Sequence, residues 1–169
     1  MKINSSYKLK YDLFVACLSI SVLLISLLAC NVFHIAYVQG QSFAANMTSL
    51  INNGNTLASK GNYNGAIAMY NQVLERDPNN IKALYDKGKA LTLLAKFAPS
   101  LNSEAIATYD KILSLDPNNI GALYGKANAL GKLGNYNAST GYYNKILSIN
   151  ATNTKALKSE ASIKAKLNK

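Results

Sequence analysis

Apolar and polar positions follow two different patterns along the chain. Residues 13–38 are almost continuously apolar and contain no Asp, Glu, Lys or Arg. As a helix this segment would extend about 39 Å at 1.5 Å per residue, which exceeds the ~30 Å hydrocarbon core of a bilayer. A buried core helix would interleave polar residues at a period of about 3.6, and this segment does not. We therefore predict that residues 13–38 form a transmembrane anchor or a signal segment.

Basic residues flank this segment asymmetrically. Lys2, Lys8 and Lys10 precede it, and the next basic residue after it is Lys60. Positively charged flanks of a membrane segment stay in the cytoplasm. The asymmetry predicts a single-pass membrane topology, with a cytoplasmic basic region at 1–12 and the rest of the chain outside the cytoplasm.

The sequence leaves three fates of residues 13–38 open. The apolar run is longer than the 7–15 residues of a usual signal core, which favours a retained membrane anchor. Small residues at 38–40 and 42–44 would suit a signal peptidase, and the protein would then be secreted. Residues 27–30, Leu-Leu-Ala-Cys, resemble a lipoprotein lipobox, which makes Cys30 a candidate lipidation site.

The chain after residue 46 follows a helical period. In 47–60 and again in 64–76, apolar residues recur at spacings of 3 and 4, which places them on one face of a helix. Gly61 separates the two segments, and Asp77-Pro78 ends the second one. No alternation of period 2 competes, so the sequence predicts a hairpin of two helices after a linker at 39–46. The apolar positions are Leu50, Ile51, Gly54, Leu57 and Ala58 in the first helix and Ala66, Ile67, Tyr70, Val73 and Leu74 in the second.

The hairpin pattern recurs along the chain. The sequence Asp-Pro-Asn-Asn-Ile occurs at 77–81 and at 116–120, and Gly-Asn-Tyr-Asn occurs at 61–64 and at 134–137. Such self-similarity at a fixed period is typical of a repeat architecture, in which each unit buries its apolar face against its neighbours.

The spacing of the units is unequal. Equivalent positions in successive units are Asp116 and Asn150, which are 34 residues apart, and Pro78 and Pro117, which are 39 residues apart. The middle unit therefore carries a five-residue insertion, which we place within 96–103.

Small and aromatic residues occupy equivalent places in each unit. A helix hairpin with this arrangement and a closing Asp-Pro resembles the tetratricopeptide repeat (TPR), which is about 34 residues long. The resemblance implies an all-α fold: an α-solenoid of about three TPR hairpins, at 47–80, 81–119 and 120–153, with a capping helix at 154–169. We interpret the matching residues as packing positions. They are Gly54, Ala66, Tyr70 and Pro78, then Leu84, Gly88, Ala105, Tyr109 and Pro117, then Leu123, Ala127, Ser139, Tyr143 and Ala151.

The resemblance also implies a binding surface. In the TPR family the first helix of each repeat lines a concave groove that binds an extended peptide or a partner helix. The corresponding residues here are basic, amidic and aromatic, which suits a protein or peptide partner that carries acidic groups. The candidate peptide-binding residues are Asn52, Asn55, Lys82, Tyr85, Lys89, Tyr124, Asn128, Lys132, Lys155 and Lys158.

A more specific form of this binding is the carboxylate clamp of chaperone-binding TPR domains. It holds a C-terminal carboxylate with lysines and asparagines from successive first helices. Only Asn55 matches that arrangement, because Ile51, Asp86, Gly121 and Gly125 occupy the other places. We therefore do not expect this chain to capture chaperone tails.

Composition narrows the function further. Cys17, Cys30 and His34 are the only Cys and His residues, and all three lie within 13–38. The rest of the chain thus lacks the residues of most hydrolytic triads and zinc sites, so we expect no enzyme, no cofactor and no metal. The formal net charge is +10, yet the lysines are scattered and the predicted location is outside the cytoplasm, so nucleic acid is not an expected partner.

The remaining motifs are glycosylation sequons. Asn46, Asn137 and Asn150 fit Asn-X-Ser/Thr, and Asn46 is the best candidate because it lies in the predicted linker. We therefore expect a non-catalytic protein-interaction scaffold or adaptor, attached to the membrane and displayed outside the cytoplasm. The alternatives are a self-assembling cell-surface module and a secreted, soluble adaptor.

Overall fold

The computed structural model describes residues 43–167 together with residues 32, 34, 37 and 41. The chain divides into two units, Met1–Asn46 and Met47–Lys169. Most of the predicted anchor or signal segment, including Cys30, and most of the candidate cleavage residues lie outside the described residues. In the part that is described, no helix has the length and apolar character that a membrane span needs.

The first unit corrects one prediction. We expected residues 39–46 to form a linker, but residue 41 and residues 43–46 are helical. The sequon residue Asn46 is therefore exposed on a helix, not in a linker as predicted. The segment 43–46 includes no Gly or Pro that would end the helix before Met47.

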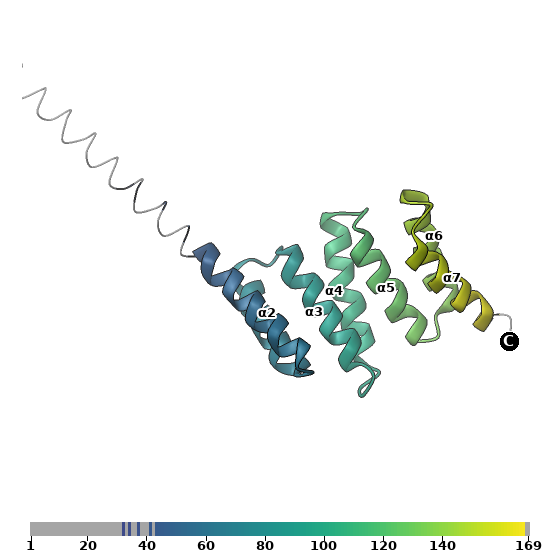
Figure 1. Ribbon diagram of the computed structural model, residues 1–169, viewed down its shortest axis with the longest axis horizontal. Coiled ribbons are helices and arrows are strands. Elements are labelled where there is room, and N and C mark those ends of the chain that lie inside the picture. The colour runs from purple at the N-terminus through teal and green to yellow at the C-terminus, as the bar shows by residue number, and fades with distance from the viewer. Residues whose placement is uncertain (1–31, 33, 35–36, 38–40, 42, 168–169) are drawn as a thin grey trace, which may run out of the picture. The chain divides into compact units, whose positions relative to one another are not determined.

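The second unit is all-helical, as the repeats predicted. Sequential helices pack on each other, and α3 also contacts α5, so the first helices of neighbouring repeats lie side by side (Figure 1). This arrangement confirms the predicted α-solenoid. Its helices are a first helix at residues 47–59, α2 (Tyr63–Arg76), α3 (Ile81–Leu94), α4 (Leu101–Leu115), α5 (Ile120–Lys132), α6 (Tyr136–Ile149) and α7 (Thr154–Leu167).

Asparagine side chains start most of these helices. Asn80 Oδ1 accepts a hydrogen bond from the backbone N–H of Ala83 at the start of α3, and Asn119 Oδ1 accepts from Ala122 at the start of α5, each at 3.0 Å. Each satisfies one of the N–H groups that have no partner within the helix. The amide groups of the same two asparagines donate to Asp77 and Asp116, which fixes the preceding turn.

The last repeat forms the same turn without proline. Asn150 stands where the earlier repeats have Asp, and its Oδ1 accepts from the backbone N–H of Thr152 at 3.1 Å. Asn153 then accepts from Ala156 at the start of α7. Asp77 and Asp116 accept in the same way from Asn79 and Asn118, so the side-chain oxygen at the first turn position stabilises this turn with or without proline.

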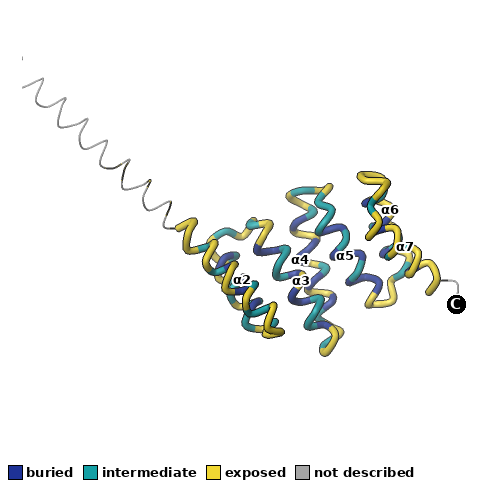
Figure 2. The backbone as a smooth tube through the Cα atoms, viewed as in Figure 1, coloured by how far each residue is buried: buried dark blue, intermediate teal, exposed yellow. Residues whose placement is uncertain are grey.

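The core lies between the paired helices and repeats in register (Figure 2). Tyr70, Tyr109 and Tyr143 are each 1% exposed, and each follows a fully buried small residue by four positions in its helix. In α6 that small residue is Ser139, whose hydroxyl donates to the backbone carbonyl of Ala127 at 2.8 Å. The serine is therefore packed as tightly as the alanines of the other repeats, since its one polar group is satisfied.

The insertion in the middle repeat is divided between loop and helices. The connection between α3 and α4 spans residues 95–100, whereas the other two repeats turn over three residues, at 60–62 and 133–135. The helices α3 and α4 are also each one residue longer than α5 and α6. The loop projects from the end of this hairpin in Figure 1, and its Phe97 is 81% exposed.

Candidate functional site

The first helices of the repeats line a groove of three connected pockets. The N-terminal pocket, of about 370 Å³, lies between the first helix and α3, and the C-terminal pocket, of about 310 Å³, lies between α5 and α7. A middle pocket of about 180 Å³ connects them, because it shares Lys89 and Leu93 with the first and Asn128 with the second. We call this continuous surface the groove.

Eight of the ten residues predicted to form the groove line its pockets. Asn52 and Lys82 lie outside the three pockets: Asn52 is exposed on the first helix, and Lys82 forms an ion pair with Asp86 at 3.3 Å. Those that line the pockets are Asn55, Tyr85, Lys89, Tyr124, Asn128, Lys132, Lys155 and Lys158.

Two buried tyrosines orient two groove asparagines. The Tyr70 hydroxyl donates to Asn55 Oδ1 at 2.7 Å, and the Tyr143 hydroxyl donates to Asn128 Oδ1 at the same distance. Burial raises the pKa of both tyrosines to about 12, so each remains a neutral donor at physiological pH. Because Oδ1 accepts from tyrosine, the Nδ2 group of each asparagine is the end that can donate to a ligand.

The middle pocket has a different construction. Tyr109 takes the place of these tyrosines, and its ring packs edge-on against Tyr85 at a centroid distance of 6.4 Å. The backbone of Gly125 lies directly beside the ring, where an added Cβ would come within 2.3 Å of Tyr109 Cζ. Only a glycine lets α5 approach this closely, so the rings of Tyr85 and Tyr109 line the middle pocket beside Asn128.

Aromatic and carbonyl contacts hold groove lysines in place. Lys155 Nζ lies 4.3 Å from the centroid of the Tyr124 ring, and the Tyr124 hydroxyl shares a 2.9 Å hydrogen bond with Ser159 Oγ. Lys132 Nζ donates to the carbonyl of Thr92 in the last turn of α3 at 2.7 Å. Burial, followed by the nearby charge of Lys96, lowers the pKa of Lys132.

Several groove residues were not predicted from the sequence. Tyr70, Tyr109 and Tyr143 were expected to serve packing alone, but each also lines one of the three pockets. Ser162 and Lys166 of α7 also line the groove without having been predicted. They follow Asn128 and Lys132 by one repeat period, so continuing the repeat into the capping helix would identify them.

The structure also places the remaining sequons. Asn137 is exposed at the start of α6, but Ser139 of the same sequon is fully buried. Asn150 is exposed in the turn before α7, and its Oδ1 accepts from both the backbone N–H and the hydroxyl of Thr152. Across the described residues, no group of three or more His, Cys, Asp or Glu side chains could hold a metal ion.

Comparisons with known proteins agree with this geometry. A TPR repeat family model matches residues 54–94, and a tetratricopeptide repeat model matches residues 108–139. The chain is a tetratricopeptide repeat protein. No curated protein matches this TPR protein.

Solved TPR structures share the fold. The first TPR domain of human RPAP3 superposes with a TM-score of 0.66 at 20% identity, covering 73% of this chain and 93% of that one. The first TPR of Spaghetti (RPAP3), bound to the HSP90 peptide SRMEEVD, has a TM-score of 0.66 at 22% identity, covering 74% and 95%. MamA has a TM-score of 0.63 at 23% identity, covering 73% of this chain and 65% of its own. At these identities the likeness concerns the fold alone.

Proposed function

We propose that this TPR protein is a non-catalytic interaction scaffold whose groove binds an extended peptide segment carrying acidic residues. The observation that carries the proposal is the charge of the groove. Lys89, Lys132, Lys155 and Lys158 line it, and Asp86 is the one acidic side chain that lines its pockets. The oriented amides of Asn55 and Asn128 add donors suited to the carbonyl groups of an extended backbone.

The related structures are consistent with an acidic partner. Spaghetti (RPAP3) is bound to the HSP90 peptide SRMEEVD, and the second TPR domain of human RPAP3 is in complex with the HSP70 peptide SGPTIEEVD. Both peptides end in acidic residues. We do not propose that this groove binds the same chaperone peptides, because Gly121 and Gly125 stand where the carboxylate clamp has basic or amide side chains. The rings of Tyr85 and Tyr109 fill the adjacent space, at 2.9 Å and 2.3 Å from the position of an added Cβ.

The experiment is a selection of peptides that bind the full-length protein in detergent. We expect acidic sequences to be enriched, and Lys155→Glu to weaken their binding by at least roughly tenfold, because placing like charges together costs more than the ~1.4 kcal/mol that tenfold requires. Lys111→Glu makes the same charge change at an exposed position on α4, outside the groove, and serves as the control. Equal effects of the two variants, or no enrichment of acidic peptides, would overturn the proposal.

We also propose that the solenoid is displayed outside the cytoplasm, attached through residues 13–38. The charge asymmetry around that segment supports this topology. Intact mass and membrane fractionation in the native host test it. Full-length mass in the membrane fraction is expected; a mass beginning near Gln41 in the soluble fraction would indicate a secreted adaptor, and a lipid adduct on Cys30 would indicate a lipoprotein.

Self-assembly is the competing use of the same groove. In that case the mass of the full-length protein in detergent would rise with concentration, and peptides would compete with the association. A constant monomer mass over the same range is the result that the adaptor function predicts.

A further inference from the structure

Charge is distributed unevenly along the groove. The N-terminal pocket is lined by Asn55, Ser59, Asp86 and Lys89, so its one lysine lies beside one carboxylate. The C-terminal pocket has three lysines and no acidic residue. Its lysines are Lys132 from α5 and Lys158 and Lys166 from α7.

The lysines of the C-terminal pocket differ from those that join neighbouring helices. Lys87 of α3 pairs with Glu104 of α4 at 3.3 Å, and Lys126 of α5 pairs with Asp110 of α4. Within the described residues, Lys132, Lys158 and Lys166 form no ion pair with a carboxylate. The two lysines at these contacts between helices are therefore paired with carboxylates, whereas, in the described part of the chain, the lysines of the C-terminal pocket keep their positive charge unpaired.

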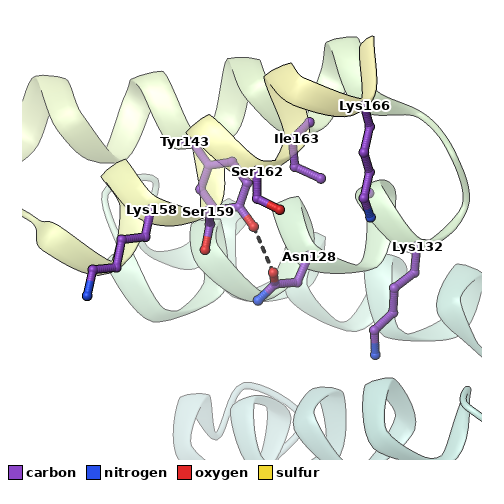
Figure 3. Close-up of a pocket in the computed structure, with 9 residues that line it drawn as sticks. Asn128, Lys132, Tyr143, Lys158, Ser159, Ser162, Ile163 and Lys166 are labelled. Atoms are coloured by element: carbon purple, nitrogen blue, oxygen red, sulfur yellow. Dashed lines mark hydrogen bonds between the residues drawn. The ribbon is translucent and has the colours of Figure 1, made fainter. Parts of the chain in front are cut away.

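Hydrogen-bond donors accompany these charges. Figure 3 shows the Tyr143–Asn128 hydrogen bond within the pocket, with Lys158 on one side in this view and Lys132 and Lys166 on the other. The bond occupies Asn128 Oδ1, so its Nδ2 group is the end available to a ligand. The hydroxyls of Ser159 and Ser162 line the same pocket.

The neighbouring repeat positions one of the lysines. The carbonyl of Thr92 accepts from Lys132 Nζ at 2.7 Å, which holds the ammonium group on the side of α5 that faces α3. Lys132 also lines the C-terminal pocket between α5 and α7. An ammonium group has three donors, so two remain for a ligand. The pocket therefore combines the charge of Lys132, held by Thr92, with the charges of Lys158 and Lys166 on α7 and with neutral donors, which suits a group that only accepts hydrogen bonds. Lys166 Nζ lies 5.8 Å from the centroid of the Tyr136 ring.

We propose that the C-terminal pocket is a carboxylate subsite, so that a bound segment carries its acidic side chains at the end lying over α5 and α7 and neutral polar residues over the first helix and α3. This inference rests on the proposed peptide-binding function. It specifies where along the groove the acidic residues dock, which the overall charge does not. Asp86 in the N-terminal pocket is already paired with Lys82, so the difference between the pockets is that the C-terminal pocket has three lysines and the N-terminal pocket has one.

Photo-crosslinking tests the docking position on the full-length protein in detergent. Two peptides are compared, one with Asp and Glu clustered at its N-terminal end and one with the reversed sequence, each with a photo-reactive group beside the acidic cluster. We expect both to crosslink to α5 or α7, because the charge decides which end docks there. Crosslinks concentrated on the first helix and α3 would overturn the subsite.

Charge-removing variants give an independent measurement. Lys158→Gln with Lys166→Gln removes two charges from the pocket, and Lys111→Gln with Lys145→Gln removes two from exposed positions on α4 and α6. We expect the pocket pair to weaken binding of the acidic peptide by roughly tenfold or more, and the control pair by less than about twofold. Equal losses would show that only net charge matters and would overturn the subsite. Lys132 is left intact because it also contacts α3.

The outcomes separate this inference from the proposed function. If neither acidic peptide binds the unmodified protein, both the groove function and the subsite are wrong. If the peptides bind and Lys155→Glu weakens their binding, while Lys158→Gln with Lys166→Gln does not, the groove function stands and the subsite is wrong. Tighter binding when phosphoserine replaces the acidic cluster would reassign the pocket to phosphate and overturn the carboxylate assignment.

Discussion

Replacing Gly125 with alanine tests the closest packing in the groove. An added Cβ at this position lies 2.3 Å from Tyr109 Cζ, 2.5 Å from Cε1 and 2.7 Å from Cε2. Favourable carbon contacts begin near about 3.5 Å, so the ring or α5 must shift by roughly 1 Å. The Tyr109 side chain is 1% exposed and packs edge-on against Tyr85, so its ring can move only toward the middle pocket that it lines.

Two opposing terms set the size of the effect. Overpacking a rigid core position typically costs about 1–3 kcal/mol, and contact with three ring carbons puts Gly125→Ala near the upper end. Alanine recovers about 1 kcal/mol relative to glycine inside a helix. We therefore expect the free energy of unfolding to fall by about 2 kcal/mol, measured by denaturant titration of the full-length protein in detergent, followed by circular dichroism.

A matched variant separates packing from helix propensity. Gly141 lies inside α6, is exposed, and has nothing within 4 Å of an added Cβ. Gly141→Ala should therefore stabilise the protein by up to about 1 kcal/mol. Adding Tyr109→Leu should reduce the cost of Gly125→Ala, because the ring that it meets is gone. If Gly125→Ala is as stable as Gly141→Ala, the packing of Tyr109 against α5 is wrong.

Three further predictions concern stability and local structure. Burial raises the pKa of Tyr70, Tyr109 and Tyr143 from 10.0 to about 12, so above pH 10 these tyrosines lose their protons in the unfolded chain before they do so in the folded protein. The free energy of unfolding should therefore be highest below about pH 10 and decrease between about pH 10 and pH 12. Unfolding curves at alkaline pH measure this, and a free energy that does not change with pH would contradict it. Asn119→Ala removes the N-cap of α5 and should cost about 1 kcal/mol in a denaturant titration, with Asn119→Ser, which can still cap, as the control. Limited trypsin digestion should cut first after Lys96, because this exposed residue lies in the long loop between α3 and α4. Cleavage at other sites while the bond after Lys96 stays intact would contradict this prediction.

The repeated helices could be predicted from the sequence because their signals are local. Spacings of 3 and 4 between apolar residues define a helix face within a few turns, and an Asn or Gly at a boundary acts on backbone groups one turn away. The prediction of a linker at 39–46 was wrong, because residues 43–46 contain no helix breaker and are helical. The five extra residues of the middle repeat are present, but they are shared between the loop at 95–100 and two lengthened helices.

Eight of the ten residues predicted from the sequence line the groove, whereas how the groove residues are paired and charged depends on the tertiary structure. The repeat period places Asn128 and Lys132 on a first helix, since one turn of helix fixes their common face. It does not reveal that Tyr143 orients Asn128 or that Lys132 reaches Thr92 in the preceding repeat. The first contact depends on how closely α5 and α6 pack within one hairpin, and the second on how closely successive hairpins stack; glycines and tyrosines packed between the helices set both distances. The positive C-terminal pocket results from that stacking.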